Sequence, residues 1–198
     1  MALKLIMGLG NPEARYEMTR HNAGFICLEK LAIKCGASFA ANKQMHSDFC
    51  KCNWQGNSLI LAKPQTYMNL SGKAAQAIVN FYKLDRNEIL VAHDDVSLPL
   101  GVIRMARGGG AGGQHGVESI IEMLGNKDFH RLKIGVGPDP GGSLRASYVL
   151  SEFPESEREL YFKVISLAVE AIEVWMKEGV QVAMNRYNGV NLQATGTA

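Results

Sequence analysis

The chain has 198 residues, of which 46% are hydrophobic and 20% charged, and its formal net charge is +2. This length suits one well-buried domain and is short for two, and the composition is ordinary for a soluble globular protein. No run approaches the ~20 apolar residues of a membrane span, and the apolar start is too short for a signal peptide, so the sequence argues against a membrane-spanning protein and predicts a cytosolic one.

Short apolar runs alternate with segments of helical periodicity, which is typical of strands and helices in turn. Gln-Gly-Asn at 55–57 indicates a hairpin, and Ser71 suits a helix N-cap. Pro154 and Gly179 mark the start and end of a long amphipathic helix. In chain order, we predict a strand over 3–9, a helix over 23–35, strands over 46–53 and 59–63, a helix over 71–82, strands over 88–92 and 101–106, a helix ending near 124, a strand over 132–136, a helix over 154–177 and a short helix ending near 187.

This alternation with one hairpin predicts an α/β fold: a single three-layer domain in which helices cover both faces of a twisted, mixed, mostly parallel sheet. We expect the domain over residues 1–188 and a flexible tail over 189–198, which is polar and small. Residues 138–147, together with the start of the helix after Pro154, are expected to form a mobile rim over a crevice.

The four cysteines fit a compartment where thiols stay reduced. Cys50 and Cys52 have the spacing of half a metal site, but no second close pair completes it, so we expect no metal. Charge is distributed unevenly, because residues 1–83 carry ten Lys/Arg and four Asp/Glu, whereas residues 151–178 carry three and seven. The asymmetry fits a polyanionic partner, and scattered solvated charge explains it equally well.

Four polar clusters follow predicted strands, where the ligand crevice of an open α/β sheet forms. Each alone suits a turn, but their joint placement favours a site. His21 with Asp94 suggests a general base and its supporting carboxylate. Because no Gly-x-Ser-x-Gly elbow supplies a nucleophile, the base would act on water. The clusters are Asn11, Tyr16, His21 and Asn22; residues 63–69; His93, Asp94 and Asp95; and Gly113, Gln114, His115 and Gly116.

Five glycines fall within residues 108–113, directly before a predicted helix. Such a loop lets backbone amides approach an anion, and the helix N-terminus favours negative charge. It is not a P-loop, since Gly-Gln-His stands where Gly-Lys-Ser/Thr is needed. Phosphate contact and plain surface charge both remain open for the nearby basic residues, which are Arg104, Arg107, Arg131 and Lys133.

Two other motifs are weak. Residues 8–13 imitate a dinucleotide fingerprint, but Glu13 replaces the third glycine and Pro12 disturbs the turn. The spacing of His93, Asp94, Asp95 and His115 is not one that usually converges on a single ion.

Together, the clusters resemble the bacterial-type peptidyl-tRNA hydrolase family. The matching stretches are GLGNPEARYEMTRHNAG (8–24), KPQTYMNLSGKA (63–74), ILVAHDDVSLPLGVIRMARGGGAGG (89–113) and FHRLKIGVG (129–137). The likeness covers nearly the full chain, in the family's order. It implies cleavage of the ester bond of peptidyl-tRNA to release a peptide and free tRNA for recycling, by a cytoplasmic monomer that needs no metal or cofactor.

The resemblance also implies roles for single residues. His21 would activate water and Asp94 would support its basic form. Asn11 would read the peptide's blocked amino end, and Asn69 would hold the peptide backbone. The amides of Asn11 and Asn69 also suit the developing oxyanion. The remaining residues implied to line the substrate end are Tyr16 and Tyr67.

One motif departs from the family, because Gly113-Gln114-His115-Gly116 stands where Gly-Gly-His-Asn-Gly is usual. Gln114 and His115 therefore take the places of two substrate-side residues, and His115 that of a substrate-binding asparagine. Arg104 matches a basic position of the family. The family's next basic position is Ala106 in this chain, and Arg107 lies one residue beyond it. The alternatives to the hydrolase are a non-catalytic RNA-binding module of the same fold and a nucleotide-binding enzyme, which the broken fingerprint disfavours.

Overall fold

The computed structural model describes residues 3–194 of the chain. At its centre lies a sheet of seven strands in the order β2-β3-β4-β1-β5-β7-β6. The central strands β4, β1, β5 and β7 are parallel, and the remaining pairings at both edges are antiparallel. The strands are β1 (Leu3–Gly8), β2 (Ala40–Asn42), β3 (Ser47–Trp54), β4 (Asn57–Pro64), β5 (Ile89–Pro99), β6 (Ile103–Arg107) and β7 (His130–Gly137).

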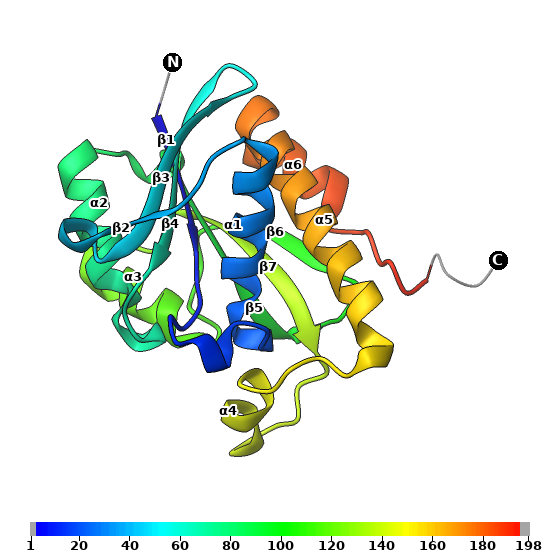
Figure 1. Cartoon of the computed structure of the whole chain (residues 1–198). Helices are drawn as coiled ribbons and strands as arrows, with labels where there is room; N and C mark the ends of the chain where they lie inside the picture. The colour runs from blue at the N-terminus through cyan, green and yellow to red at the C-terminus, as the bar shows by residue number, and fades with distance from the viewer. Residues whose placement is uncertain (1–2, 195–198) are drawn as a thin grey trace.

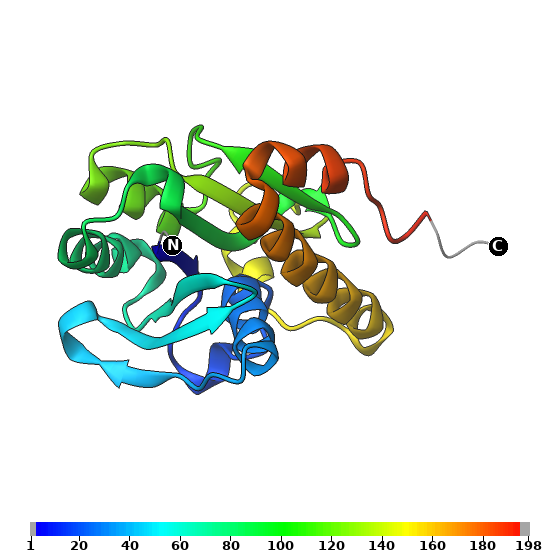
Figure 2. The ribbon, with the colours of Figure 1, turned by 90° about the horizontal axis from the view of Figure 1, so that it is seen from above.

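Helices cover both faces of this sheet. In Figures 1 and 2, α1, α5 and α6 lie over one face and α2 and α3 over the other, while α4 projects beyond the lower ends of β5 and β7. The helices are α1 (Ala23–Lys34), α2 (Ser71–Tyr82), α3 (His115–Leu124), α4 (Leu144–Val149), α5 (Glu155–Glu178) and α6 (Val180–Tyr187). The predicted three-layer, mostly parallel α/β fold is therefore confirmed.

The core is divided into two by the sheet, and β1 shows how the sequence produces this. Ile6 is buried on the side of α1 and α5, whereas Leu5 and Met7 are buried on the side of α2 and α3. Successive strand residues point to opposite faces, so a strand covered on both sides must be apolar throughout. That is why β1 reads as a continuous apolar run.

The predicted hairpin is confirmed as the connection of β3 to β4. Gln55 and Gly56 both have positive φ angles, of 50° and 80°, as a two-residue turn matched to the twist of the strands requires. Pro154 directly precedes α5, and Gly179 directly follows it.

Ser71 does not cap α2 as predicted. It is the first residue of that helix, and its hydroxyl donates to the carbonyl of Met68 at 2.8 Å. The hydroxyl thus stabilises the preceding 3-10 turn, Met68–Leu70, a local bond that serines readily form.

Residues within the tail expected over 189–198 contact the rest of the fold. Asn191 forms a β-bridge with Val102, and the Leu192 N–H donates to the carbonyl of Gly101 at 3.0 Å. The chain is therefore tied to the turn after β5 well into the expected tail, and residues 195–198 lie outside the described residues. The short strand β2 and the helix α4, within the expected rim, were not predicted.

Three glycines let α1 begin very close to the strand ends. A Cβ atom on Gly8 would lie 2.3 Å from the carbonyl oxygen of Gly24, and one on Gly24 would lie 2.3 Å from that of Ala92. On Gly10, it would lie 2.7 Å from the ring of Phe25. Only hydrogen fits at these positions, so the loop before α1 is held against the ends of β1 and β5.

We predict that Gly24→Ala lowers the free energy of unfolding by about 2 kcal/mol, within the range for overpacking a close contact. The added methyl group meets backbone atoms, which cannot swing away. Denaturant unfolding measures the loss. Gly189→Ala is the matched control, because no atom lies within 4 Å of a Cβ there. Equal stability of the two variants would show that the contact is not tight.

Candidate active site

A cavity of about 560 Å³ lies at the carboxyl ends of β1 and β5. Its floor comes from β5 and one wall from the glycine-rich loop before α3. Residues 142–150, which include α4, form a further wall. Asn11 and His21 complete the lining of the cavity. The predicted meeting of the clusters at one edge of the sheet is thus realised for three of them.

His21 is held by a carboxylate in this cavity. Its Nδ1 lies 2.8 Å from Oδ2 of Asp94. A carboxylate only accepts, so the proton of the neutral imidazole sits on Nδ1 and Nε2 carries the free electron pair. Burial lowers the pKa of His21, but the charge of Asp94 and the hydrogen bond to it outweigh burial, and the pKa lies above its ordinary value.

Asp94 is 3% exposed, and both of its carboxylate oxygens have partners. Oδ1 accepts from Nε2 of Gln114 at 3.0 Å. Nδ1 of His93, the residue before Asp94 in β5, donates to the backbone carbonyl of Asp94 at 2.8 Å. Burial lowers the pKa of His93.

Gln114, expected on the substrate side, lines the cavity, and its side-chain amide bonds inside the protein. Its Oε1 accepts from the backbone N–H of Val117 at 2.9 Å, which makes Gln114 the N-cap of α3. Its Nε2 serves Asp94 and lies 3.3 Å from the sulfur of Met68. With both ends of the amide committed inside the protein, Gln114 orients Asp94.

Asn11 has its amide orientation fixed by the backbone. Oδ1 accepts from the N–H of Met68 at 3.0 Å. Asn22 brackets Asn11, since its Oδ1 accepts from the Asn11 N–H at 2.9 Å and its Nδ2 donates to the Asn11 carbonyl at 3.0 Å. Nδ2 of Asn11 is therefore the group left to donate to a ligand in the cavity.

The other expected substrate residues lie away from this centre. Tyr67 is 58% exposed, Asn69 is exposed on the neighbouring 3-10 turn, and the half-buried Tyr16 lies under the guanidinium of Arg15. None of these three lines the cavity. His115 borders it, with a side chain 72% exposed and Nδ1 3.3 Å from Oε2 of Glu118.

The four basic residues expected at phosphates differ in access. Arg104 and Arg107 are exposed on the edge strand β6. Lys133 forms an ion pair with Asp95 at 3.0 Å. Arg131 is 1% exposed and donates to the carbonyls of Gly110 and Gly109, each at 2.5 Å. The expectation of phosphate contact fails for Arg131, because its buried guanidinium holds the glycine loop.

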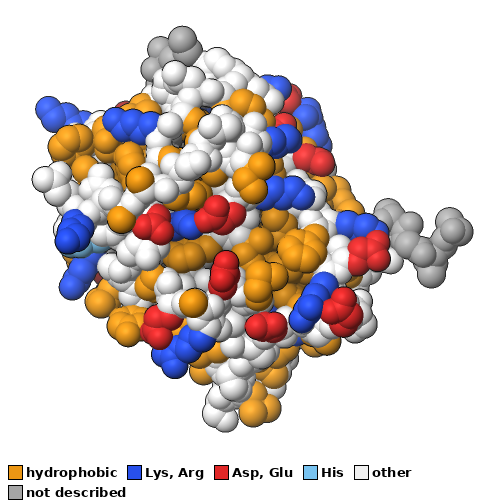
Figure 3. Space-filling model, in the orientation of Figure 1, with side chains coloured by type: hydrophobic (Ala, Val, Ile, Leu, Met, Phe, Trp, Pro, Cys, Tyr) orange, Lys and Arg blue, Asp and Glu red, His pale blue; other side chains and the backbone are white. Residues whose placement is uncertain are grey.

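The uneven charge of the sequence is partly used inside the fold. Lys34 of α1 pairs with Glu173 of α5, so the basic front of the chain meets the acidic late helix. Figure 3 accordingly shows acidic and basic side chains interspersed on the face of α1 and α5. In this part of the molecule, the asymmetry does not produce a surface of one sign.

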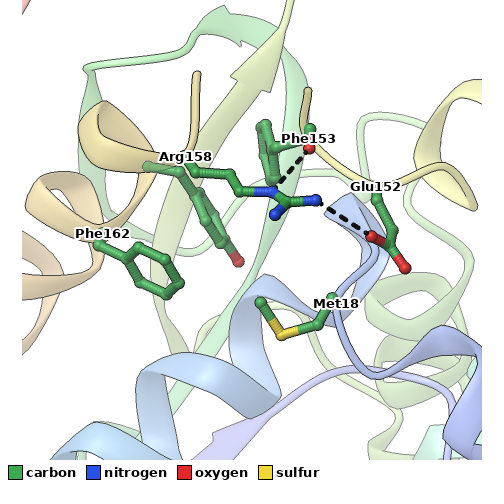
Figure 4. A pocket seen from close by; sticks show the side chains of 6 residues that line it. Met18, Glu152, Phe153, Arg158 and Phe162 are labelled. Atoms are coloured by element: carbon green, nitrogen blue, oxygen red, sulfur yellow. Dashed lines mark hydrogen bonds and ion pairs between the residues drawn. The ribbon is translucent and has the colours of Figure 1, made fainter. Parts of the chain in front are cut away.

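A second, smaller hollow of about 100 Å³ lies beside the N-terminal end of α5 (Figure 4). Met18, Phe153 and Phe162 contribute apolar walls, and Arg158 donates to the carbonyl of Phe153 at 3.3 Å. No histidine lines it, so it offers no counterpart to the pair in the larger cavity.

Among residues 3–194, no group of three or more His, Cys, Asp or Glu side chains is arranged to hold a metal ion. Within the same residues, no helix has the length and apolar character to cross a membrane.

Comparison with known proteins identifies the family of the chain. The family model described as peptidyl-tRNA hydrolase matches residues 5–195. The chain is 46% identical to a peptidyl-tRNA hydrolase of Elusimicrobium minutum, over 94% of this chain and 99% of that protein. It is 45% identical to one of Desulforamulus reducens, over 96% and 90%. The crystal structure of peptidyl-tRNA hydrolase from Acinetobacter baumannii aligns with a TM-score of 0.91 at 36% identity, covering 96% of each chain.

Proposed function

The chain belongs to the peptidyl-tRNA hydrolase family, and from this premise we propose that His21 is the general base that activates water against the ester bond of peptidyl-tRNA. The family's activity, hydrolysis of this aminoacyl ester, is the function of the chain. The single observation that supports His21 is its hydrogen bond of 2.8 Å to Asp94 in the wall of the cavity. That bond leaves Nε2 as the basic atom.

The reaction needs three contributions from the protein. A water hydrogen-bonded to Nε2 of His21 attacks the ester carbonyl carbon while its proton passes to Nε2. Asp94 stabilises the imidazolium that forms. Nδ2 of Asn11 donates to the carbonyl oxygen, where negative charge develops. As the tetrahedral intermediate collapses, the carbon–oxygen bond to the ribose breaks, and the ribose oxygen takes the proton from His21.

The substrate is larger than the cavity, which suits the placement of the outer residues. We assign Tyr16, Tyr67 and Asn69 to contacts with the peptide or with the end of the tRNA beyond the cavity. We assign His115 to the rim of the cavity. His115 has one ring nitrogen beside Glu118 and the other for the substrate. The chain acts, in this proposal, as a cytoplasmic monomer and needs no cofactor.

The exposed arginines of β6 are proposed to bind tRNA phosphates. Arg104 and Arg107 lie on an edge strand that leads into the glycine loop. Charged side chains on an edge strand also discourage pairing with other chains, so tRNA binding must be tested separately from stability.

His21→Asn should lower the rate of hydrolysis of an N-acetylaminoacyl-tRNA by about 100-fold or more, the usual contribution of a general base. In the parent, activity should fall as the pH drops through the His21 pKa, which lies above the ordinary value near 6.5, because only the neutral ring accepts a proton.

His46→Asn is the matched control for this substitution. His46 is exposed, lies in a turn away from the cavity and has a φ of 47°, which asparagine tolerates. Turnover by His21→Asn equal to that of His46→Asn would remove His21 from the mechanism.

Replacing Arg104 and Arg107 by glutamine should weaken tRNA binding at low salt. It should also reduce the slope of log affinity against log salt by about one unit per lost phosphate contact. Binding titrations at several salt concentrations measure the slope. Lys51→Gln is the control, because Lys51 is exposed on β3, near the edge of the sheet farthest from β6. An unchanged slope in the double variant would place the phosphates elsewhere.

A further inference from the structure

Arg20, the residue before His21, is 5% exposed although it is charged. Its Nη1 donates to the hydroxyl of Ser151 at 2.8 Å, to the carbonyl of Glu152 at 2.6 Å and, more weakly, to the carbonyl of Ser151 at 3.3 Å. Its Nη2 pairs with Glu157 at 3.3 Å. These polar partners belong to the segment that joins α4 to α5 and to the first turn of α5, while the buried Nε has no hydrogen-bond partner.

Two aromatic rings enclose the same guanidinium. Its central carbon lies 4.4 Å from the centre of the Tyr148 ring and 4.5 Å from that of Phe153. Planar guanidinium groups stack on aromatic faces, which a lysine ammonium cannot imitate with the same geometry. Tyr148 is fixed in turn, since its hydroxyl donates to the carbonyl of Val136 in β7 at 2.7 Å.

The backbone continues this connection. The Arg20 N–H donates to the Ser151 carbonyl at 3.1 Å, and Thr19 forms an antiparallel bridge with Glu152. The segment held in this way follows directly on α4, and residues 142–150 form a wall of the cavity that contains His21. The Arg20 side chain and the backbone beside it therefore link the 3-10 turn of His21, Arg20–Asn22, to this wall.

We propose that Arg20 is a positioning residue that holds residues 142–153 closed over the cavity and so sets the affinity for substrate. It does not touch the reacting atoms. Without it, the wall would be in its binding position for only part of the time, and the apparent affinity falls by that fraction. Once substrate is bound, the contacts of the substrate keep the wall in place, so turnover at saturation changes less. This inference rests on the proposed function of the cavity.

Arg20→Met tests the proposal, because methionine keeps an apolar stem and removes all five donors. We expect KM for N-acetylaminoacyl-tRNA to rise about tenfold, with kcat changed by less than about threefold, as for loss of binding without loss of the chemical step. The acid limb of the pH profile should not move, since the His21–Asp94 pair is untouched. Amide exchange over residues 142–153 should accelerate. Arg20→Lys should be intermediate, because it restores the charge without the planar fork.

Arg158→Met is the matched control. Arg158 reaches the same segment from α5, where it donates to the carbonyl of Phe153 and pairs with Glu152 and Glu155 (Figure 4 shows the first two contacts). It is half exposed and has no contact with the turn of His21 among the bonds described, so KM and exchange should stay near those of the parent. If Arg20→Met does not fold, the double variant Tyr148→Leu/Ser151→Ala weakens the same connection from the α4 side and should raise KM in the same direction.

Unchanged KM and unchanged exchange in residues 142–153, in either Arg20→Met or the double variant, would overturn the proposal. So would equal effects of Arg20→Met and Arg158→Met, which would indicate a general loss of structure. The exchange measurement needs no substrate. It therefore decides the role of Arg20 even if His21→Asn retains full activity and the proposed function fails.

Discussion

The hydrogen bond between His21 and Asp94 is the interaction on which the rest of the site depends. It joins a loop between β1 and α1 to the middle of β5, and it forms only if these elements approach closely. Gly8 and Gly24 permit that approach, because a side chain on either would collide with backbone atoms. The N–H of Leu9 also donates to the carbonyl of Ala92 at 2.9 Å, which ties the loop to β5.

A buried carboxylate is unfavourable unless it is paired, and leaving one unpaired costs several kcal/mol. Asp94 meets this requirement with His21 on one oxygen and Gln114 on the other. Gln114 also caps α3, so the orientation of the carboxylate is coupled to the start of that helix. Arg20 and Arg131 extend the same principle, since each buries a charge against backbone carbonyls of a segment beside the cavity.

Strong local signals made most of the fold predictable from the sequence. The apolar run of β1, the turn at residues 55–57 and the proline before α5 each have one dominant interpretation. Polar residues at strand ends also indicated where the site would be. Arg131 shows the limit of such reasoning, because an arginine beside a glycine loop looks the same in sequence whether it faces solvent or the loop's carbonyls. The part played by Gln114 was hidden for a related reason, since its partners lie 20 and 46 residues away.

In the proposed mechanism, Asp94 makes Nε2 of His21 the basic atom. Long-range ¹H–¹⁵N NMR spectra of the histidine rings, recorded above the His21 pKa, report which nitrogen carries the proton. We predict a protonated Nδ1 and an unprotonated Nε2 in the parent, and a lower His21 pKa in Asp94→Asn, where the negative charge is lost. A proton on Nε2 in the neutral parent, or an unchanged His21 pKa in the variant, would rule out this role of Asp94.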